Sequence, residues 1–187
     1  MNSDPPSFRL AVGIAGPLGA GKTTLARGLC RVLPAAHISF GLLIKKEARA
    51  RALPVDRESL QDLGDALIAA EGEAQFVRHA IASQASMGET TAVFDSVRHV
   101  SVWRAIQDLH PRAVLIYQDV EGSVALARLC ARDGITLDVA RGYASHAMEL
   151  KAQLLRQHAD LVIGPSTQEE GLQLACTRIH VLERELE

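Results

Sequence analysis

The feature that most constrains this chain is a glycine-rich stretch near its N-terminus, Gly16-Pro17-Leu18-Gly19-Ala20-Gly21-Lys22-Thr23, which is followed by Thr24. It fits the pattern G-x-x-x-x-G-K-[ST] of a phosphate-binding loop. Residues 8–15 before it form a mostly apolar run of strand length. The apolar residues after it recur with the spacing of one helix face: Leu25, Leu29, Val32 and Leu33. Pro34 ends that helix, so strand, loop and helix follow in the order that such a loop requires.

The residue types of this stretch match the chemistry of a polyphosphate site. Glycine has no Cβ, so the backbone can turn tightly there and approach a phosphate closely. The amides of the loop and of the helix N-terminus then point at one anion. We expect ATP to bind through Gly16, Gly19, Ala20, Gly21, Lys22, Thr23 and Thr24. Lys22 would reach the β- and γ-phosphates, and the Thr23 hydroxyl would ligate Mg²⁺. The alternative is a glycine-rich turn with a surface lysine.

Length and composition fit a single globular domain. The 187 residues suffice for one α/β domain, and the apolar share of 48% is ordinary. The net charge of −2 gives no sign of a nucleic-acid or membrane-surface partner. The three cysteines lie far apart without disulfide or zinc spacing, and no apolar run approaches the length of a membrane span. We expect a cytoplasmic protein, monomeric or homodimeric, whose partner is a small-molecule phosphate acceptor.

Short apolar strands alternate with segments of helical period along the rest of the chain. The strands are expected at residues 8–15, 35–38, 91–95, 113–117 and 161–163. This alternation is typical of a parallel sheet covered by helices on both faces. The prediction is a single α/β domain over residues 1–187, a five-stranded parallel sheet in a three-layer sandwich, with 91–95 as its central strand. Helices within about 39–88 would form an insertion over one edge of the sheet.

Asp95 ends one of these strands, and open α/β sheets bind ligands at the carboxyl ends of their strands. A carboxylate at this place could hold Mg²⁺ together with Thr23, or could orient an attacking oxygen. The alternative is structural, because Asp95 and Ser96 precede a predicted helix and both residue types cap helices well. The two roles can also coexist.

Arg98 lies three residues after Asp95, in Asp95-Ser96-Val97-Arg98, and here the sequence resembles a known family. Nucleoside monophosphate kinases such as adenylate kinase carry Asp-Gly-x-Pro-Arg at this point, and some relatives carry Asp-Gly-x-Arg. In this chain Ser96 replaces the glycine. The resemblance implies that Arg98 binds the phosphate of the acceptor, as a planar guanidinium suits. A surface arginine on a helix is the alternative.

The resemblance continues before the insertion. Ile38-Ser39-Phe40-Gly41-Leu42-Leu43-Ile44-Lys45 is similar to the adenylate-kinase stretch Ile-Ser-Thr-Gly-Asp-hydrophobic-Leu-Arg. It implies that Lys45 stands where the family has a phosphate-binding arginine. Phe40 and Leu42 replace the family's threonine and aspartate, which leaves the base of the acceptor open. Arg57 begins the next predicted helix and could face the same pocket, or could lie on a solvated helix face.

Two further stretches resemble the same kinases. Arg128-x-x-x-Arg132 looks like the arginine pair at the base of the family's lid, which implies contacts with the donor nucleotide and with the transferred phosphoryl group. The lid would be short, about residues 133–141, without a zinc insertion, and Arg141 would leave it. Residues 159–163 look like the end of dephospho-CoA kinase, although Gly164-Pro165 replaces the usual Asp-Asn.

Taken together, these patterns predict a transferase that moves the γ-phosphoryl group of ATP·Mg²⁺ onto a phosphorylated small molecule, foremost a (deoxy)nucleoside monophosphate. Lys22, Asp95 and Arg132 would be the catalytic residues. Two rivals stay open: a kinase whose acceptor is a hydroxyl of another metabolite such as dephospho-CoA, with Asp95 as base, and a regulatory protein that binds ATP without transferring phosphate. A metal site at His146 and Glu149 is not expected, because no third ligand accompanies them.

Overall fold

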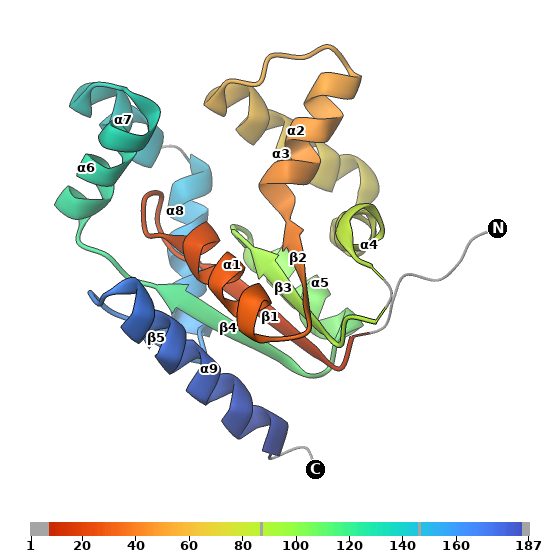
Figure 1. The fold of residues 1–187 in the computed structure, drawn as a ribbon. Coiled ribbons are helices and arrows are strands. Elements are labelled where there is room, and N and C mark those ends of the chain that lie inside the picture. The colour runs from red at the N-terminus through yellow and green to blue at the C-terminus, as the bar shows by residue number, and fades with distance from the viewer. Residues whose placement is uncertain (1–7, 87, 146, 185–187) are drawn as a thin grey trace.

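A computed structural model of the chain describes residues 8–86, 88–145 and 147–184. Five strands form one parallel sheet in the order β2-β3-β1-β4-β5 (Figure 1). Their bounds are β1 (Leu10–Ala15), β2 (Ala35–Ser39), β3 (Thr91–Asp95), β4 (Ala113–Gln118) and β5 (Leu161–Ile163). This is an α/β fold, and the predicted five-stranded parallel sheet is confirmed.

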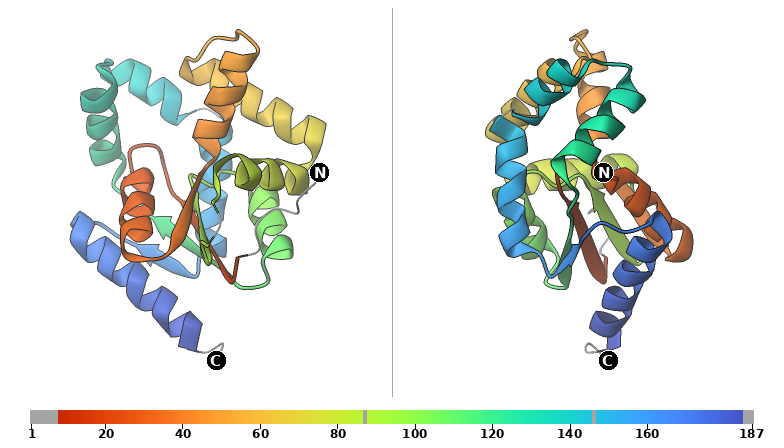
Figure 2. Two further views of the ribbon diagram at one scale, coloured as in Figure 1. Left: turned by 45° about the vertical axis from the view of Figure 1, so that its right-hand side comes forward. Right: turned by 90° about the vertical axis from the view of Figure 1, so that its left-hand side faces the viewer.

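Helices cover both faces of the sheet (Figure 2). The first face packs on α1 (Lys22–Val32) and α9 (Gln168–Arg184). The second packs on α4 (Glu73–Gln84), α5 (Val100–Leu109) and the 3₁₀ helix η1 (Leu155–His158). Strand side chains alternate between the two apolar clusters: Val12 and Ile14 belong to the first, whereas Ala11 and Ala15 belong to the second. Burial on both faces explains why these strands read as continuous apolar runs.

The central strand is β1, which corrects the expectation that residues 91–95 occupy the centre. β1 pairs with β3 on one side and with β4 on the other, so β3 lies between β1 and the edge strand β2. The phosphate-binding loop therefore leaves the middle of the sheet. The strand order reverses direction at β1, and open α/β sheets form their binding crevice at such a point.

Two helical arms stand above the carboxyl edge of the sheet (Figure 1). One arm contains α2 (Phe40–Ala50) and α3 (Arg57–Glu71), which with α4 fill the segment predicted as an insertion. The other contains α6 (Gly122–Asp133) and α7 (Leu137–Ala144). The segment expected to be a lid, 133–141, spans the end of α6, a turn at Gly134 with φ of 64° and the first half of α7. Both arms thus overhang the loop that follows β1.

Two further helices follow α6. The first, α7, ends at Ala144, and Ser145 is its C-cap. The chain then forms α8 (Ala147–Leu154) before η1. His146, which the sequence analysis considered as a metal ligand, lies outside the described residues. In the described part of the chain, no helix is long and apolar enough to cross a membrane.

Candidate active site

The phosphate-binding loop has the backbone that its glycines predict. Gly16, Gly19 and Gly21 all have positive φ, at 139°, 82° and 92°, a conformation that side chains disfavour. Space is also closed to a side chain at two of them, because a Cβ at Gly16 would collide with the carbonyl oxygen of Gln118, and one at Gly19 with that of Ala125. The loop is therefore fixed between β4 and α6 as well as by its own turn.

Lys22 begins α1 and is buried, with 6% of its surface exposed. Its Nζ donates hydrogen bonds to the carbonyl oxygens of Gly16, at 2.8 Å, and Pro17, at 2.7 Å. The ammonium group therefore lies against the inside of the loop, and the alternative of a surface lysine does not hold. No side chain caps the helix at Gly21, so the first amides of α1 remain directed at the place where a phosphate would lie.

Asp95 is the best-buried acidic residue near this loop, with 2% of its surface exposed. Thr23 Oγ1 lies 3.3 Å from its Oδ1, to which Ser96 Oγ also donates at 2.9 Å, and His37 Nε2 lies 3.3 Å from its Oδ2. Burial alone would raise the pKa of Asp95, but the hydrogen bonds from His37, Ser96 and Thr23 outweigh it and hold the pKa below its ordinary value. The carboxylate is therefore ionised at neutral pH.

The N-cap alternative for Asp95 and Ser96 is not realised, because α5 starts at Val100 and His99 is its N-cap. Ser96 instead adopts a left-handed backbone with φ of 69°, which costs a residue other than glycine about 1–2 kcal/mol. This explains the glycine that the nucleoside monophosphate kinases carry at the matching position. In this chain Ser96 pairs the strained backbone with a hydrogen bond to the carboxylate beside it.

The pair of Thr23 and Asp95 fits a magnesium site. Mg²⁺ prefers oxygen ligands and usually keeps several waters, with one or two protein ligands and the substrate phosphates completing the shell. A hydroxyl and an ionised carboxylate 3.3 Å apart at the mouth of the loop meet that description. Among the described residues, no group of three His, Cys, Asp or Glu side chains could hold a metal. With Thr23 and Asp95 as protein ligands, the substrate phosphates and water would complete the shell of a bound Mg²⁺.

A basic cavity of about 450 Å³ opens between the loop and the two arms. We call it the acceptor-side cavity. Its cationic lining comes from α1, α3, α6 and the segment after β3: Lys22, Arg57, Arg98, Arg128 and Arg132. Arg98 lies between β3 and α5 and not on a helix. Four of the five arginines that the sequence analysis assigned to the site therefore meet in one place, which linear order alone could not guarantee.

Asp133, at the end of α6, holds two of these arginines. Its carboxylate accepts from Arg132 Nε at 2.6 Å and lies 3.4 Å from Arg57 Nη2. The Arg57 guanidinium also lies over the Tyr143 ring of α7, 5.3 Å from its centroid. The hydrogen bond from Arg132 is the main reason why the pKa of Asp133 is below its ordinary value. Arg57 thus bridges the two arms across the cavity.

Two predicted substrate-binding residues lie elsewhere in this conformation. Lys45 is on the exposed face of α2 and is not among the residues that line the acceptor-side cavity. Arg141 on α7 is 62% exposed and pairs with Asp138 of its own helix at 3.2 Å. Neither shares the cavity that holds Arg57 and Arg98. Their assigned contacts with substrate would need movement of the arms that carry them.

Of the three departures from the family patterns, at Phe40, Leu42 and Gly164, the structure explains the first. Phe40 points into the core, where its ring stacks with Phe76 at 5.3 Å and with Phe94 at 5.9 Å between centroids. It therefore replaces a polar residue with packing. Leu42 is 56% exposed. The third departure, Gly164, follows β5 and lines the second cavity.

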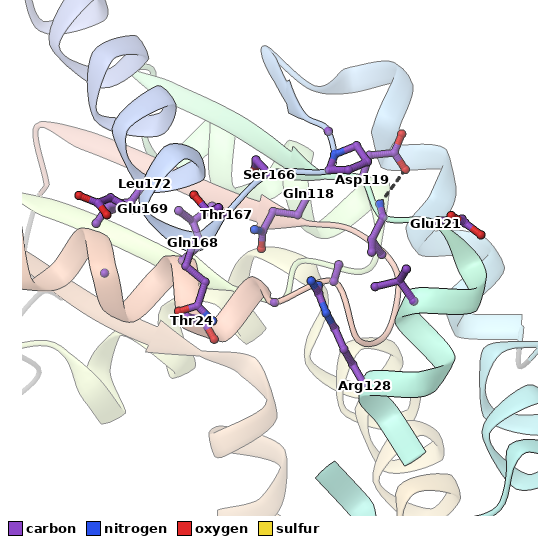
Figure 3. A pocket seen from close by; sticks show the side chains of 18 of the residues that line it. Thr24, Gln118, Asp119, Glu121, Arg128, Ser166, Thr167, Gln168, Glu169 and Leu172 are labelled. Atoms are coloured by element: carbon purple, nitrogen blue, oxygen red, sulfur yellow. Dashed lines mark hydrogen bonds between the residues drawn. The ribbon is translucent and has the colours of Figure 1, made fainter. Parts of the chain in front are cut away.

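This second cavity, of about 540 Å³, lies on the other side of the loop, and we call it the donor-side cavity (Figure 3). Its walls include the first turns of α1 and residues 164–169, which lead into the start of α9. Arg128 lines both this cavity and the acceptor-side cavity. Leu172 seats α9 on α1 at Gly28, where an added Cβ would lie 3.2 Å from Leu172 Cδ1. The dimensions suit a small-molecule ligand.

Several residues around the two cavities were missed in the sequence. His37 and Asp133 contact predicted residues, and Gln118 closes the loop from behind. The sequence carries no signal for these three residues. The family glycine at the position of Ser96 indicated only the positive φ of Ser96 itself. A histidine in a short apolar strand and an aspartate after an arginine carry no motif that would have identified them.

About two thirds of the chain matches a known protein family. A family model described as "AAA domain" matches residues 15–139. The chain belongs to this AAA domain family. The AAA domain match includes the phosphate-binding loop, Asp95 and all the arginines of the acceptor-side cavity, whereas α8, β5 and α9 follow it. No curated protein matches the chain.

Solved structures share the fold at low sequence identity. TT1252 from Thermus thermophilus superposes with a TM-score of 0.64 at 18% identity, over 94% of this chain and 98% of that one. A gluconokinase from Sinorhizobium meliloti reaches 0.55 at 15% identity, covering 97% of each chain. A shikimate kinase from Acinetobacter baumannii, in complex with shikimate, reaches 0.55 at 18% identity and 96% of each chain. These likenesses show that this AAA domain protein has the fold of small phosphate-loop kinases.

Proposed function

We propose that this protein is a small-molecule kinase that transfers the γ-phosphoryl group of ATP·Mg²⁺ to an anionic acceptor. One observation carries the proposal: the phosphate-binding loop and four arginines from three separate elements line a single cavity, and Arg128 lines this cavity and the donor-side cavity together. A triphosphate tail on the loop would thus lie between a place for its nucleoside and a basic place for a second substrate. The kinases among the structural neighbours support the same class of reaction.

Each residue has a role that its position supports. Lys22 and the loop amides would bind the donor phosphates, and Thr23 with Asp95 would hold Mg²⁺, which neutralises charge on the β- and γ-phosphates. Arg128 and Arg132 would face the transferring group, where positive charge stabilises the transition state. Arg57 and Arg98 would bind the acceptor's anionic group and align it. The segment 133–141 and the assigned contacts of Lys45 and Arg141 would come into play when the arms close.

The first candidate for the acceptor is a (deoxy)nucleoside monophosphate. The arginine-rich lining favours a phosphate dianion, and Arg98 follows Asp95 at the spacing of the kinases that the sequence resembles. A phosphate oxygen is already a nucleophile, so this reaction needs no strong base. The closing arms would exclude water, which would otherwise compete for the phosphoryl group.

A second candidate is an acceptor that reacts through a hydroxyl group of an anionic metabolite. The contact between His37 and the buried, ionised Asp95 favours it, because a fixed carboxylate at the strand end could accept the hydroxyl proton. The gluconokinase and shikimate kinase among the neighbours are compatible with this choice. In both cases the acceptor carries a negative charge, as the cavity requires.

The test is a transfer assay with γ-labelled ATP, Mg²⁺ and a panel of nucleoside monophosphates and hydroxy acids. Phosphorylation of a monophosphate with loss of turnover in Arg98→Ala supports the first candidate, and phosphorylation of a hydroxy acid supports the second. Arg104→Ala, an exposed change on α5 outside both cavities, is the control. ATP binding without transfer to any acceptor would reject the proposal and favour a regulatory nucleotide-binding protein.

A further inference from the structure

Gln118 is a polar residue on an otherwise apolar face of the sheet. It ends β4, where Val114 and Ile116 point into the cluster beneath α1 and α9, and the alternation of the strand places Gln118 on the same side. A strand end at the carboxyl edge of a parallel sheet is a position for recognition. The side chain thus lies beneath the junction of the phosphate-binding loop with α1.

The amide of Gln118 is incompletely satisfied. Among the described residues, its Oε1 is buried and has no hydrogen-bond partner. A buried amide oxygen without a donor destabilises the protein relative to one that is paired, so native structures rarely leave one without a reason. The side chain lines the donor-side cavity, and Figure 3 shows its amide among the other side chains that line it.

Gly21 leaves room in front of this amide. A Cβ on Gly21 would point at it, 3.8 Å from Oε1 and 3.9 Å from Nε2. Since Gly21 carries no side chain, the loop places only backbone atoms in front of the amide. The loop glycine therefore has a second effect besides its backbone conformation: no side chain separates the buried, unsatisfied acceptor from a ligand that would sit on the loop.

We propose that Gln118 is a specificity-determining residue for the donor, whose Oε1 accepts a hydrogen bond from an N–H or O–H group of the nucleoside. The inference rests on the proposed function, because it needs a nucleoside triphosphate on the phosphate-binding loop. An amino group of the base and a hydroxyl group of the ribose are the two sources of such a donor. A site that holds a hydrogen-bond acceptor rejects ligands that leave it unpaired.

The experiment measures nucleotide binding to the full chain by calorimetry, with Mg²⁺ and without an acceptor, so that it does not depend on phosphoryl transfer. ATP is compared with purine riboside triphosphate, which lacks the 6-amino group, and with 2′-deoxy-ATP and 3′-deoxy-ATP. We expect one of the three analogues to bind about tenfold more weakly than ATP, the effect of one lost hydrogen bond. The analogue that loses affinity identifies the source.

The matched variant is Gln118→Met, which keeps the length of the side chain and removes the acceptor. It should bind ATP and that analogue equally, whereas Gln107→Met, on the exposed face of α5, should keep the wild-type preference. Equal binding of all four nucleotides by the wild-type protein would overturn the inference, as would a preference that persists in Gln118→Met. If the wild-type protein bound no nucleoside triphosphate, the proposed function itself would fail, which is a distinct result.

Discussion

The two cavities that meet at Arg128 differ in the charges that line them. The donor-side cavity has mixed charge, with Arg31 and Arg128 opposed by Asp119, Glu121 and Glu169. The acceptor-side cavity has five cationic side chains, and none of the described residues that line it is acidic. Its counter-charges are the buried Asp95 and the exposed Asp133, neither of which is among the lining residues. We infer that the donor's nucleoside is recognised by shape and hydrogen bonds, whereas the acceptor is recognised by charge.

The largest expected effect comes from Lys22, the buried lysine of the phosphate-binding loop. Lys22→Ala should reduce kcat/KM for ATP by about 1,000-fold, because under the proposed function it removes the buried cation that would bind the donor phosphates. Lys46→Ala, on the exposed part of α2, should have no effect. Steady-state kinetics and thermal unfolding of both variants provide the test. If Lys22→Ala lost activity only in proportion to a loss of folded protein, its role would be structural.

Arg98→Ala tests the acceptor side of the comparison. It should raise the acceptor's KM by about 10- to 100-fold, the loss of a charge-assisted hydrogen bond, and should leave the KM for ATP within about twofold. Steady-state kinetics with each substrate varied in turn measure both values.

Lys45→Ala is the informative comparison for Arg98→Ala, since Lys45 was assigned the same role but lies outside the cavity. An equal rise in the acceptor's KM would show that α2 moves in during closure. A defect of Arg98→Ala confined to ATP would contradict the division between the two cavities.

Asp133→Asn should act in the opposite direction. The carboxylate contacts Arg57 and Arg132 in this structure, so an anionic acceptor would compete with it for these two arginines. Removing this charge should lower the acceptor's KM by about two- to fivefold, the size of an exposed ion pair.

The control for Asp133→Asn is Asp108→Asn, which removes an exposed carboxylate of α5 outside both cavities and should change nothing. A rise in the acceptor's KM in Asp133→Asn would mean that Asp133 positions the arginines for the substrate and does not compete with it.

Ser96→Gly should have the smallest effect and a mixed one. Glycine relieves the left-handed backbone, which would stabilise the protein by up to about 1 kcal/mol, although its greater freedom in the unfolded chain offsets part of this. The hydrogen bond to Asp95 is lost at the same time, so turnover should fall by a few-fold. Urea unfolding and steady-state kinetics separate the two effects. Because Ser96 lines only the acceptor-side cavity, an altered donor specificity would not agree with the comparison.

Local sequence patterns were sufficient for the fold class and for the loop. The glycines at 16, 19 and 21 and the apolar runs on either side specify a strand, a turn of unusual φ and a helix, and each of these depends on neighbours in the chain. Arg98, Arg128 and Arg132 were predicted from a resemblance to kinases of known pattern, and Arg57 from its place at the start of a predicted helix. All four line the acceptor-side cavity.

Long-range pairing could not be predicted in the same way. The central place of β1 depends on β3 inserting beside it, and the apolar pattern of residues 91–95 is the same in either position. Arg57 and Asp133 are 76 residues apart, and His37 and Asp95 are 58 apart. Such contacts between single side chains leave no periodic signal. The depth of Lys22 was hidden for a similar reason, because its partners are backbone carbonyls of the loop itself.

The contact between Leu172 and Gly28 couples the seat of α9 to the shape of the donor-side cavity. The segment 164–167 runs directly into α9, and Gly28 and Leu172 both line the cavity. A Cβ at position 28 would lie 3.2 Å from Leu172 Cδ1, so a larger residue there would press on Leu172 and on the start of α9. One substitution at this glycine would thereby reshape two walls of the same cavity at once.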